Sequence, residues 1–440
     1  MQLMNIPPLI PVLVVSLLVA GCLFGAYINL NRKRIIDDLP TSKTQGVFIG
    51  LAELKGTAES ESPLISYLAA AQCVQYVWQI DEHWQRTVTE AYHDAQGRTQ
   101  TRSRTESGWT SVSHGDESKA FYLKDDTGVI RIMPEGARIQ GNVTFNKTVK
   151  PSDALYYGKG PANAVANSTH ERRFHEEVVP LHAMLYVLGQ ARVRTDIVAA
   201  EIAQDKDSPM FLISTRSEKQ VSTGYSFWSW FFSVFGLMIA AAGGGWWFAV
   251  STASSPGWQP FVIAAASYLI LWALIWVWMV YNSIVSLHHR VEQGWSQVDV
   301  QLKRRNDLIP NLIHAVEGYR MYERETQKAI TELRRQMEAT PPGMPGPDFK
   351  GTVPLMQGTI ERYPELKANE PFLKLQQSLV DTEQRIALAR DYFNDVSTFY
   401  NTRLSIIPDR YVAALVGLRP GTLLTATDFE RAHVAVDLAT

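Results

Sequence analysis

Hydrophobic residues are distributed unevenly along this chain, in three apolar runs separated by longer stretches of mixed polarity. The runs cover about residues 8–30, 225–250 and 261–281, and each is as long as the roughly 20 residues that a helix needs to cross a bilayer. A short segment around STASSPG separates the second run from the third, and tryptophans stand near the ends of both. The pattern predicts three transmembrane helices, of which the last two form a hairpin.

The second run contains small residues at Ala240–Ala242 and Gly243–Gly245. One interpretation is a small-residue face on which helices pack closely. The other is a set of flexible glycines that face lipid.

Between the first and second runs, apolar residues alternate with polar ones. Val74, Tyr76, Trp78 and Ile80 fall on one face of a strand, as the period of two requires. Strand patterns recur at Gly46–Gly56, at Phe121–Pro134 with a turn at Asp125–Gly128, and from Val178, while Thr99–Thr110 is polar like an exposed hairpin. This region is predicted to be a small mixed or barrel-like β domain with at least one short helix.

Beyond the third run, apolar residues repeat with the 3.5-residue spacing of packed helices. A first helix is predicted from Tyr281 to Met337, and a second begins after the N-cap candidate Asn369 and ends at Pro408. Two such seams are expected to pack as an antiparallel hairpin, followed by a shorter helix at Tyr411–Leu418. The seam positions include Trp295, Val298, Leu302, Ile309, Phe372, Leu379, Ile386, Ala389, Phe393, Val396 and Tyr400.

The fold class that follows is a multidomain α+β membrane protein with three transmembrane helices, a small β-rich domain and an antiparallel helical bundle. The predicted parts are an anchor (1–30), the β-rich domain (31–224), the transmembrane hairpin (225–281, with helices at 225–250 and 261–281), a helical domain (282–420) containing a proline-rich connector (339–364), and a tail (421–440).

Two features of the first helix have more than one interpretation. Pro310 removes a backbone hydrogen bond and predicts a kink, which is either a hinge or a kink that neighbours pack against. Lys303, Arg304 and Arg305 suggest anionic lipid, but a straight helix carries them about 33 Å from Tyr281 at ~1.5 Å per residue. A leaflet potential decays over ~8 Å, so pairing with Asp381, Glu383 or another subunit is the better hypothesis.

Composition excludes several classes of function. The 440 residues carry a net charge of −2, so there is no overall basic surface for nucleic acid. Two cysteines, Cys22 and Cys73, cannot form a disulfide framework or a cysteine-based zinc module. His170 and His175 are five residues apart, whereas a zincin helix needs four. We expect no catalytic residue, no metal and no cofactor.

The lysines and arginines predict an orientation. Arg32–Arg34 follow the first run and Arg290 follows the third, while the N-terminal tail and the hairpin loop carry no charge. The positive-inside rule therefore places the N-terminus outside and both large soluble regions in the cytoplasm, in a bacterial inner membrane. The alternative is periplasmic placement, because Leu18–Cys22 resembles a lipoprotein cleavage box, although the apolar run continues past Cys22 and no cation precedes it.

The region between the first two membrane helices resembles the GIDE-type, beside-a-membrane domain of mitochondrial membrane-anchored ubiquitin ligases. The resemblance is carried by Pro63-Leu64, Cys73–Tyr76, Asp126–Val129, Glu177–Pro180, Leu185–Ala191 and Phe211–Ser214. In those ligases a RING domain with paired zinc sites performs catalysis, and this chain has no such cluster of cysteines and histidines. The resemblance therefore does not bring ubiquitin transfer with it.

The helical region resembles the LemA family between about residues 280 and 420. The motifs are Tyr281–Ser283, Trp295–Asp299, Gln301–Leu312, Tyr363–Asn369, Ala389–Asn394, Tyr400-Asn401 and Pro408. The resemblance implies a membrane-anchored antiparallel helical bundle, mostly cytoplasmic, in a family without an assigned enzymatic activity. The proline-rich insertion after Met337 departs from the family pattern.

The leading functional hypothesis is a membrane scaffold that assembles into a homo-oligomer. Its other expected partners are the lipid bilayer and an unknown protein. The alternative is an accessory subunit or adaptor of a membrane enzyme such as a protease, and a ubiquitin-ligase-like activity is the weakest. Residues in the family motifs are the interaction or structural candidates: Trp295, Asp299, Lys303, Arg304, Arg305, Asp307, Pro310, Asn311, Arg390, Asn394, Tyr400 and Asn401.

Overall fold

The computed structural model describes residues 9–93, 99–194, 196, 199–206, 208–252, 257–317, 370–421 and 423–424. These form two compact units. The β unit is Thr41–Gln220, and the helical unit combines Met1–Pro40 with Val221–Thr440. The chain therefore leaves the helical unit after its first helix and returns to it about 180 residues later.

The β unit contains a closed ring of strands. Strand β2 pairs with β6, β6 with β7, β7 with β12, β12 with β11, and β11 again with β2. The interior holds fully buried residues such as Leu54, Leu123 and Val187. The strands of this sheet are β1 (Thr41–Ser42), β2 (Gly50–Glu59), β6 (Phe121–Lys124), β7 (Val129–Ile132), β8 (Arg138–Gln140), β11 (Met184–Val193), β12 (Ala200–Ala203) and β13 (Leu212–Ser214).

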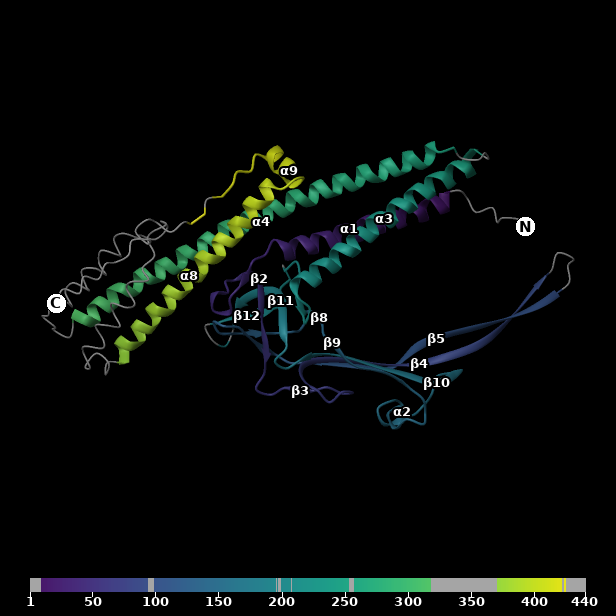
Figure 1. Cartoon of the computed structure of the whole chain (residues 1–440), viewed down its shortest axis with the longest axis horizontal. Helices are drawn as coiled ribbons and strands as arrows, with labels where there is room; N and C mark the ends of the chain where they lie inside the picture. Colours follow the sequence, from purple (N-terminus) through teal and green to yellow (C-terminus); the bar gives the residue numbers. More distant parts are fainter. Residues whose placement is uncertain are drawn as a thin grey trace. The chain divides into compact units, whose positions relative to one another are not determined.

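A second sheet has the order β3-β4-β10-β9, with β5 paired along the other side of β4. Its strands are β3 (Leu64–Ile65), β4 (Gln72–His93), β5 (Thr99–Ser118), β9 (Asn142–Val149) and β10 (Ser168–Pro180). Pairing with β10 stops at Trp84, whereas β4 and β5 continue together to His93 and Thr99 as a long two-stranded ribbon (Figure 1). A 3-10 turn (Thr44–Gly46) and the short helix α2 (Ala154–Gly158) complete the described part of the unit.

Several strand predictions are confirmed. The Asp125–Gly128 turn joins β6 to β7, and Val74 and Ile80 are buried on β4. Thr99–Thr110 belongs to the mostly exposed strand β5. His170 and His175 lie on a strand, β10, and not on a helix. Cys73 is fully buried, and this burial raises the pKa of its thiol to about 11.

The helical unit is built from α1 (Leu9–Asp37), α3 (Glu218–Thr252), α4 (Gln259–Glu317), α8 (Glu370–Ser405) and α9 (Asp409–Val416). Helices α1, α3 and α4 are each long and apolar enough to cross a membrane, and the chain is a membrane protein. The predicted third span and the predicted amphipathic helix are one continuous helix, α4, which continues through Pro310. Met337 and the connector 339–364 lie outside the described residues.

The glycines of α3 bring helices close together. A Cβ at Gly243 would stand 2.5 Å from a methyl carbon of Val15 on α1, and one at Gly244 would stand 2.5 Å from the Cβ of Ala264 on α4. A Cβ at Gly245 would meet the ring of Phe261 at 2.2 Å. These contacts support the interpretation of the small residues as a packing face and not as flexible glycines facing lipid.

Helices α4 and α8 pack along their predicted seams. Buried seam residues come from both helices: Val298, Leu302, Leu379, Ile386, Ala389, Phe393, Val396 and Tyr400. The contacts show that the helices run antiparallel, because the ring of His288 faces Tyr400 and that of Trp295 faces Phe393. The side chains of Ile309 and Phe372 lie outside the described set.

Candidate functional site: a charged clasp at the end of the first membrane helix

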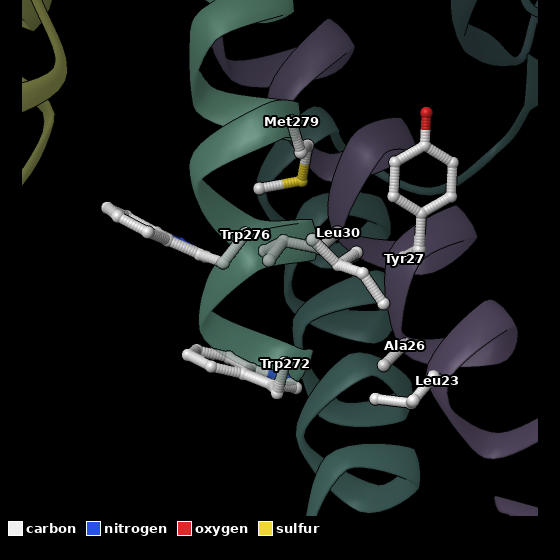
Figure 2. Close-up of a pocket in the computed structure, with 8 residues that line it drawn as sticks. Leu23, Ala26, Tyr27, Leu30, Trp272, Trp276 and Met279 are labelled. Atoms are coloured by element: carbon white, nitrogen blue, oxygen red, sulfur yellow. The ribbon is translucent and has the colours of Figure 1, made fainter. Parts of the chain in front are cut away.

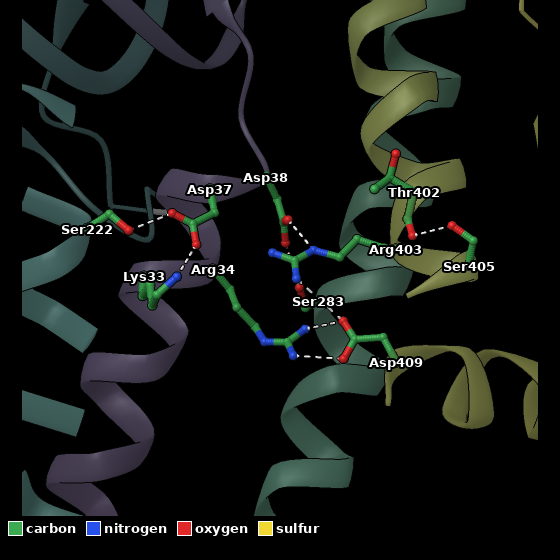
Figure 3. A network of polar contacts seen from close by, with 10 residues as sticks. All are labelled: Lys33, Arg34, Asp37, Asp38, Ser222, Ser283, Thr402, Arg403, Ser405 and Asp409. Atoms are coloured by element: carbon green, nitrogen blue, oxygen red, sulfur yellow. Dashed lines mark hydrogen bonds and ion pairs between the residues drawn. The ribbon is translucent and has the colours of Figure 1, made fainter. Parts of the chain in front are cut away.

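Arg34 lies in the last turn of α1 and Asp38 directly follows the helix, and these two side chains reach helices α8 and α9. Arg34 donates two hydrogen bonds to the carboxylate of Asp409, at 2.9 and 3.0 Å. Both side chains are nearly buried, at 10% and 3% exposure. The parallel geometry of a guanidinium and a carboxylate is the strongest arrangement for an ion pair. It fastens the end of a membrane helix to the first residue of α9 (Figure 3).

A second pair joins α1 to α8. The Nε of Arg403 donates to the carboxylate of Asp38 at 2.6 Å, and the hydroxyl of Ser283 on α4 donates to the same carboxylate at 3.0 Å. Arg403 also approaches Asp409 at 3.6 Å. The four charges therefore form one network, which we call the clasp: Arg34, Asp38, Arg403 and Asp409 (Figure 3).

The surroundings of Arg403 favour its charged form. Burial opposes the charge on Arg403, but the nearby carboxylates of Asp38 and Asp409 outweigh it and raise the pKa of the guanidinium. A neighbouring pair extends the network to α3, because Lys33 bonds Asp37 and the hydroxyl of Ser222 donates to Asp37 at 2.6 Å. Helices α1, α3, α4, α8 and α9 thus meet in one set of polar contacts.

Cavities beside the clasp are apolar. A niche between α1 and α4, lined by residues such as Leu23, Leu30 and Met279, holds about 10 Å³ (Figure 2). This is about the space of one water probe, so the niche is a packing gap. A larger groove of about 480 Å³ lies among α1, α3 and α4. Two of its polar side chains bond within the protein: Tyr268 donates to the carbonyl of Ser233, and Trp272 donates to the hydroxyl of Ser233.

The aromatic and basic candidate residues of α4 lie at or near its contact with α8. Trp295 packs edge-on against Phe393, with ring centroids 5.6 Å apart. Arg305 is buried and lies 3.7 Å from the carboxylate of Glu383, which confirms the expected pairing with the second helix. Lys303 and Arg304 are exposed on α4.

Three other candidates on α8 bond to the backbone of residues that follow α9. The side-chain amide of Asn394 donates to the carbonyl of Leu424 and accepts from its N–H, at 3.0 and 2.9 Å. Asn401 makes the same reciprocal pair with Gly421. The hydroxyl of Tyr400 donates to the carbonyl of Arg419 at 3.1 Å. These family-motif residues therefore hold the backbone at Arg419, Gly421 and Leu424, and we call these three residues the strap.

The remaining candidates are spread over α4 and α8 and are not brought together. Asp299 and Arg390 are half-buried, while Asp307 and Asn311 are exposed, and the Asn311 amide donates to the carbonyl of Asp307. Pro310 lies inside α4, half-buried. Within the described ranges there is no cluster of three or more His, Cys, Asp or Glu side chains suited to a metal ion.

Sequence reasoning missed the clasp. It interpreted Arg34 as one of the cations that set membrane orientation, and it gave Asp38, Arg403 and Asp409 no role. Arg34 and Asp409 are 375 residues apart, so no local spacing connects them. The weak local signal is that Asp409 opens a short helix directly after Pro408.

Comparison with known proteins identifies the helical region. Residues 294–438 match the model of the LemA family. The C-terminal part of this chain is similar to the LemA family. The protein LemA of Metamycoplasma hominis is 22% identical over 158 residues, which span 35% of this chain and 72% of the relative. The magnetosome protein MamQ of Magnetospirillum gryphiswaldense is 23% identical over 189 residues, spanning 36% of this chain and 70% of the relative.

A second family model, GIDE, described as E3 ubiquitin ligase, matches residues 89–247. The match begins in β4 and ends within the membrane helix α3. Both family resemblances predicted from the sequence are therefore confirmed. Pro63-Leu64 and Cys73–Tyr76, quoted above for the GIDE resemblance, lie before the matched range.

Proposed function

We propose that this protein is an integral-membrane scaffold that self-assembles and binds a protein partner through its LemA-family helices, without catalysis of its own. The observation that carries the proposal is the clasp. A buried two-bond ion pair between Arg34 and Asp409 fixes the LemA-family helices to the end of a membrane helix. A flexible tether would not need such a contact, whereas a scaffold must present its surface in a defined position.

The composition of the two helices supports this role. Their apolar seam is buried between them, and the face they present carries charged residues such as Lys303, Arg304 and Asp307. Such a surface binds through complementary charge and shape. The strap adds an ordered edge, held by Asn394 and Asn401.

The second candidate function is an accessory subunit of a membrane enzyme. The GIDE match favours it, because that model is described as a ubiquitin ligase while this chain contains two cysteines in all. A RING domain needs more zinc ligands than this chain's cysteines supply. A GIDE-type domain without a RING could recognise a protein for an enzyme that is a separate chain. We do not propose ubiquitin transfer.

Light scattering of the full chain, extracted in detergent, separates the two candidates. The scaffold predicts a homo-oligomer of defined stoichiometry. A monomer that co-purifies with one second protein in a fixed ratio would favour the accessory subunit. A monomer without a partner across several detergents would contradict both.

We further propose an inner-membrane location with the N-terminus and the α3–α4 loop outside and both units in the cytoplasm, based on the placement of Arg32–Arg34 and Arg290. Ser118 is exposed on β5, so a cysteine placed there tests the orientation. It should not react with an impermeant thiol reagent in intact cells. The unmodified chain is the control, because Cys22 and Cys73 are buried; reaction specific to the Ser118→Cys chain would place the β unit outside.

A further inference from the structure

Helix α9 exposes an apolar stripe. Ile407, just before the helix, and Tyr411 and Leu415 within it are 64%, 62% and 85% exposed. Tyr411 and Leu415 are four residues apart and therefore lie on one face of α9. Ala414 is exposed on the same side. Large apolar side chains this exposed on one short segment indicate a surface that makes a contact.

The opposite face of α9 fixes its position against α4. Val412 and Ala413 are buried in one cluster with Met279, Val280 and Ile284 of α4. Helix α9 therefore lies along α4 at the place where the third apolar run ends (Figure 1). The clasp places the start of α9 at a corresponding position along α1. Asp409 binds Arg34, which lies just beyond the end of the first apolar run.

This level corresponds to the boundary of the bilayer. The apolar runs end near residues 30 and 281, and Ile284 is three residues, or about 5 Å, further along the helix at ~1.5 Å per residue. The headgroup layer on each side of the hydrocarbon core is roughly 5–8 Å thick. Helix α9 is thus held at headgroup depth, where one face can reach the acyl boundary.

The residues around the stripe fit a lipid surface. Arg410 and Arg419 are exposed at either end of α9, where a cation can reach an anionic headgroup. A tyrosine within the stripe suits the interface, because its ring is apolar and its hydroxyl is polar. A helix with one apolar face and flanking cations, lying at this depth, has the features of an interfacial membrane helix.

We infer that α9 lies in the membrane interface, with Ile407, Tyr411 and Leu415 inserted into lipid and Arg410 and Arg419 at the headgroups. The inference goes beyond the scaffold function, because it gives the LemA-family region its own lipid contact. On this inference the helical unit contacts the membrane through α9 as well as through its three membrane-spanning helices.

Site-directed spin labelling in nanodiscs tests this inference on the full chain. Leu415→Cys and Tyr411→Cys each receive a nitroxide, and accessibility to oxygen, which concentrates in lipid, is compared with that to a water-soluble nickel complex. Both labels should be more accessible to oxygen than to nickel. The unmodified chain measures labelling of Cys22 and Cys73, which are buried.

Two matched positions complete the experiment. Arg410→Cys lies on the same helix, one residue away from the stripe, and should be more accessible to nickel than Leu415→Cys. Gln377→Cys is exposed on α8, 28 residues before its end at Ser405 and so about 40 Å along the helix, and should be accessible to nickel alone.

The outcomes decide the inference. Nickel accessibility at positions 411 and 415 equal to that at 377 would place the stripe in water and overturn it. Protection of 411 and 415 from both reagents, with two copies in each disc, would show that a second copy covers the stripe, which also overturns it. Either result leaves the mass measurement of the scaffold proposal unaffected.

Discussion

Two buried arginines in this protein are held in different ways. Arg172 in the β unit donates to Glu82 at 3.0 and 3.1 Å and to the carbonyls of Tyr156, Pro161 and Asn163. Both charged side chains are 0% exposed. Burial opposes the charge on Glu82, but hydrogen bonds from Ser168 and Arg172 outweigh it and hold its pKa below the usual value.

Arg34 in the helical unit has a partner that is distant in sequence. Arg172 and Glu82 face each other on paired strands, β10 and β4, so the sheet register brings them together. Arg34 and Asp409 are not brought together by any strand register. The carboxylate of Asp409 also interacts with Arg403. The first pair completes the interior of one unit, whereas the second decides whether separate helices stay together. A buried ion pair is therefore structural in both places, but its loss should be global in the first and local in the second.

The largest effect is expected for Arg172→Ala. It leaves the Glu82 carboxylate buried without its main partner, which should cost about 3–5 kcal/mol of unfolding free energy. Chemical denaturation of the purified full chain, followed by tryptophan fluorescence, measures the change. The double variant Arg172→Met with Glu82→Leu removes both charges and should recover most of the stability; a single variant as stable as the parent would contradict the role of the pair.

Asp409→Asn is expected to have the next largest effect. It keeps the shape of the side chain but leaves Arg34 and Arg403 short of a carboxylate, at a cost of about 2–3 kcal/mol, discounted for partial solvent access. Hydrogen exchange should rise in α9 and in the end of α1, while the β strands stay protected. Asp37→Asn is the matched control, because Asp37 is more exposed and its partner Lys33 is 29% exposed. If exchange rose equally across the β unit, the clasp would not be local.

Release of the strap should be smaller still. Asn401→Ala removes a donor and an acceptor that face the backbone of Gly421, which should cost about 1–2 kcal/mol. The expected readout is faster hydrogen exchange at Gly421 with unchanged exchange in the α4–α8 seam. Asn311→Ala, on an exposed part of α4, serves as the control, and protection of Gly421 in Asn401→Ala would show that the clamp is not needed.

The smallest effect is expected in the dependence of unfolding free energy on acidic pH. Asp125 accepts hydrogen bonds from the backbone of Thr44, Thr127 and Gly128, and although burial opposes its charge, these and hydroxyl bonds lower its pKa to about 2. Because the folded pKa is depressed, its contribution of about 1 kcal/mol is present above about pH 4 and is lost as pH falls toward 2. Asp125→Asn should flatten this part of the stability curve. An unchanged pH dependence would assign the acid sensitivity to other carboxylates, Glu82 first.

The sequence predicted those parts of the fold that depend on local spacing. The seam residues Leu302, Leu379 and Ile386 could be identified because a 3.5-residue period determines which side chains face a partner helix. The β6–β7 turn was predictable because Asp125 and Gly128 favour that geometry. Pairing of β2 with β11 was not, since residues more than a hundred positions apart leave no mark on local periodicity.

The candidate site was less predictable for the same reason. Asn394, Tyr400 and Asn401 were selected from a family motif, but their contact with the strap depends on where Arg419, Gly421 and Leu424 approach α8. The clasp was missed because charge next to a membrane helix has an ordinary explanation in the positive-inside rule. Burial and the bonds to Asp409 distinguish Arg34 from Arg32, and both are properties of the folded chain.

The continuity of α4 has a mechanical consequence. From Tyr281, at the end of the apolar run, to Glu317 the helix extends about 54 Å at ~1.5 Å per residue. As a lever pivoting at the bilayer surface, it moves its far end by about 1 Å for each degree of tilt. Membrane helices adjust their tilt to bilayer thickness, so a thinner or thicker membrane would be translated into a sideways displacement of the far end. The clasp lies near the pivot, where a small shift in its contacts corresponds to a large movement of the far end.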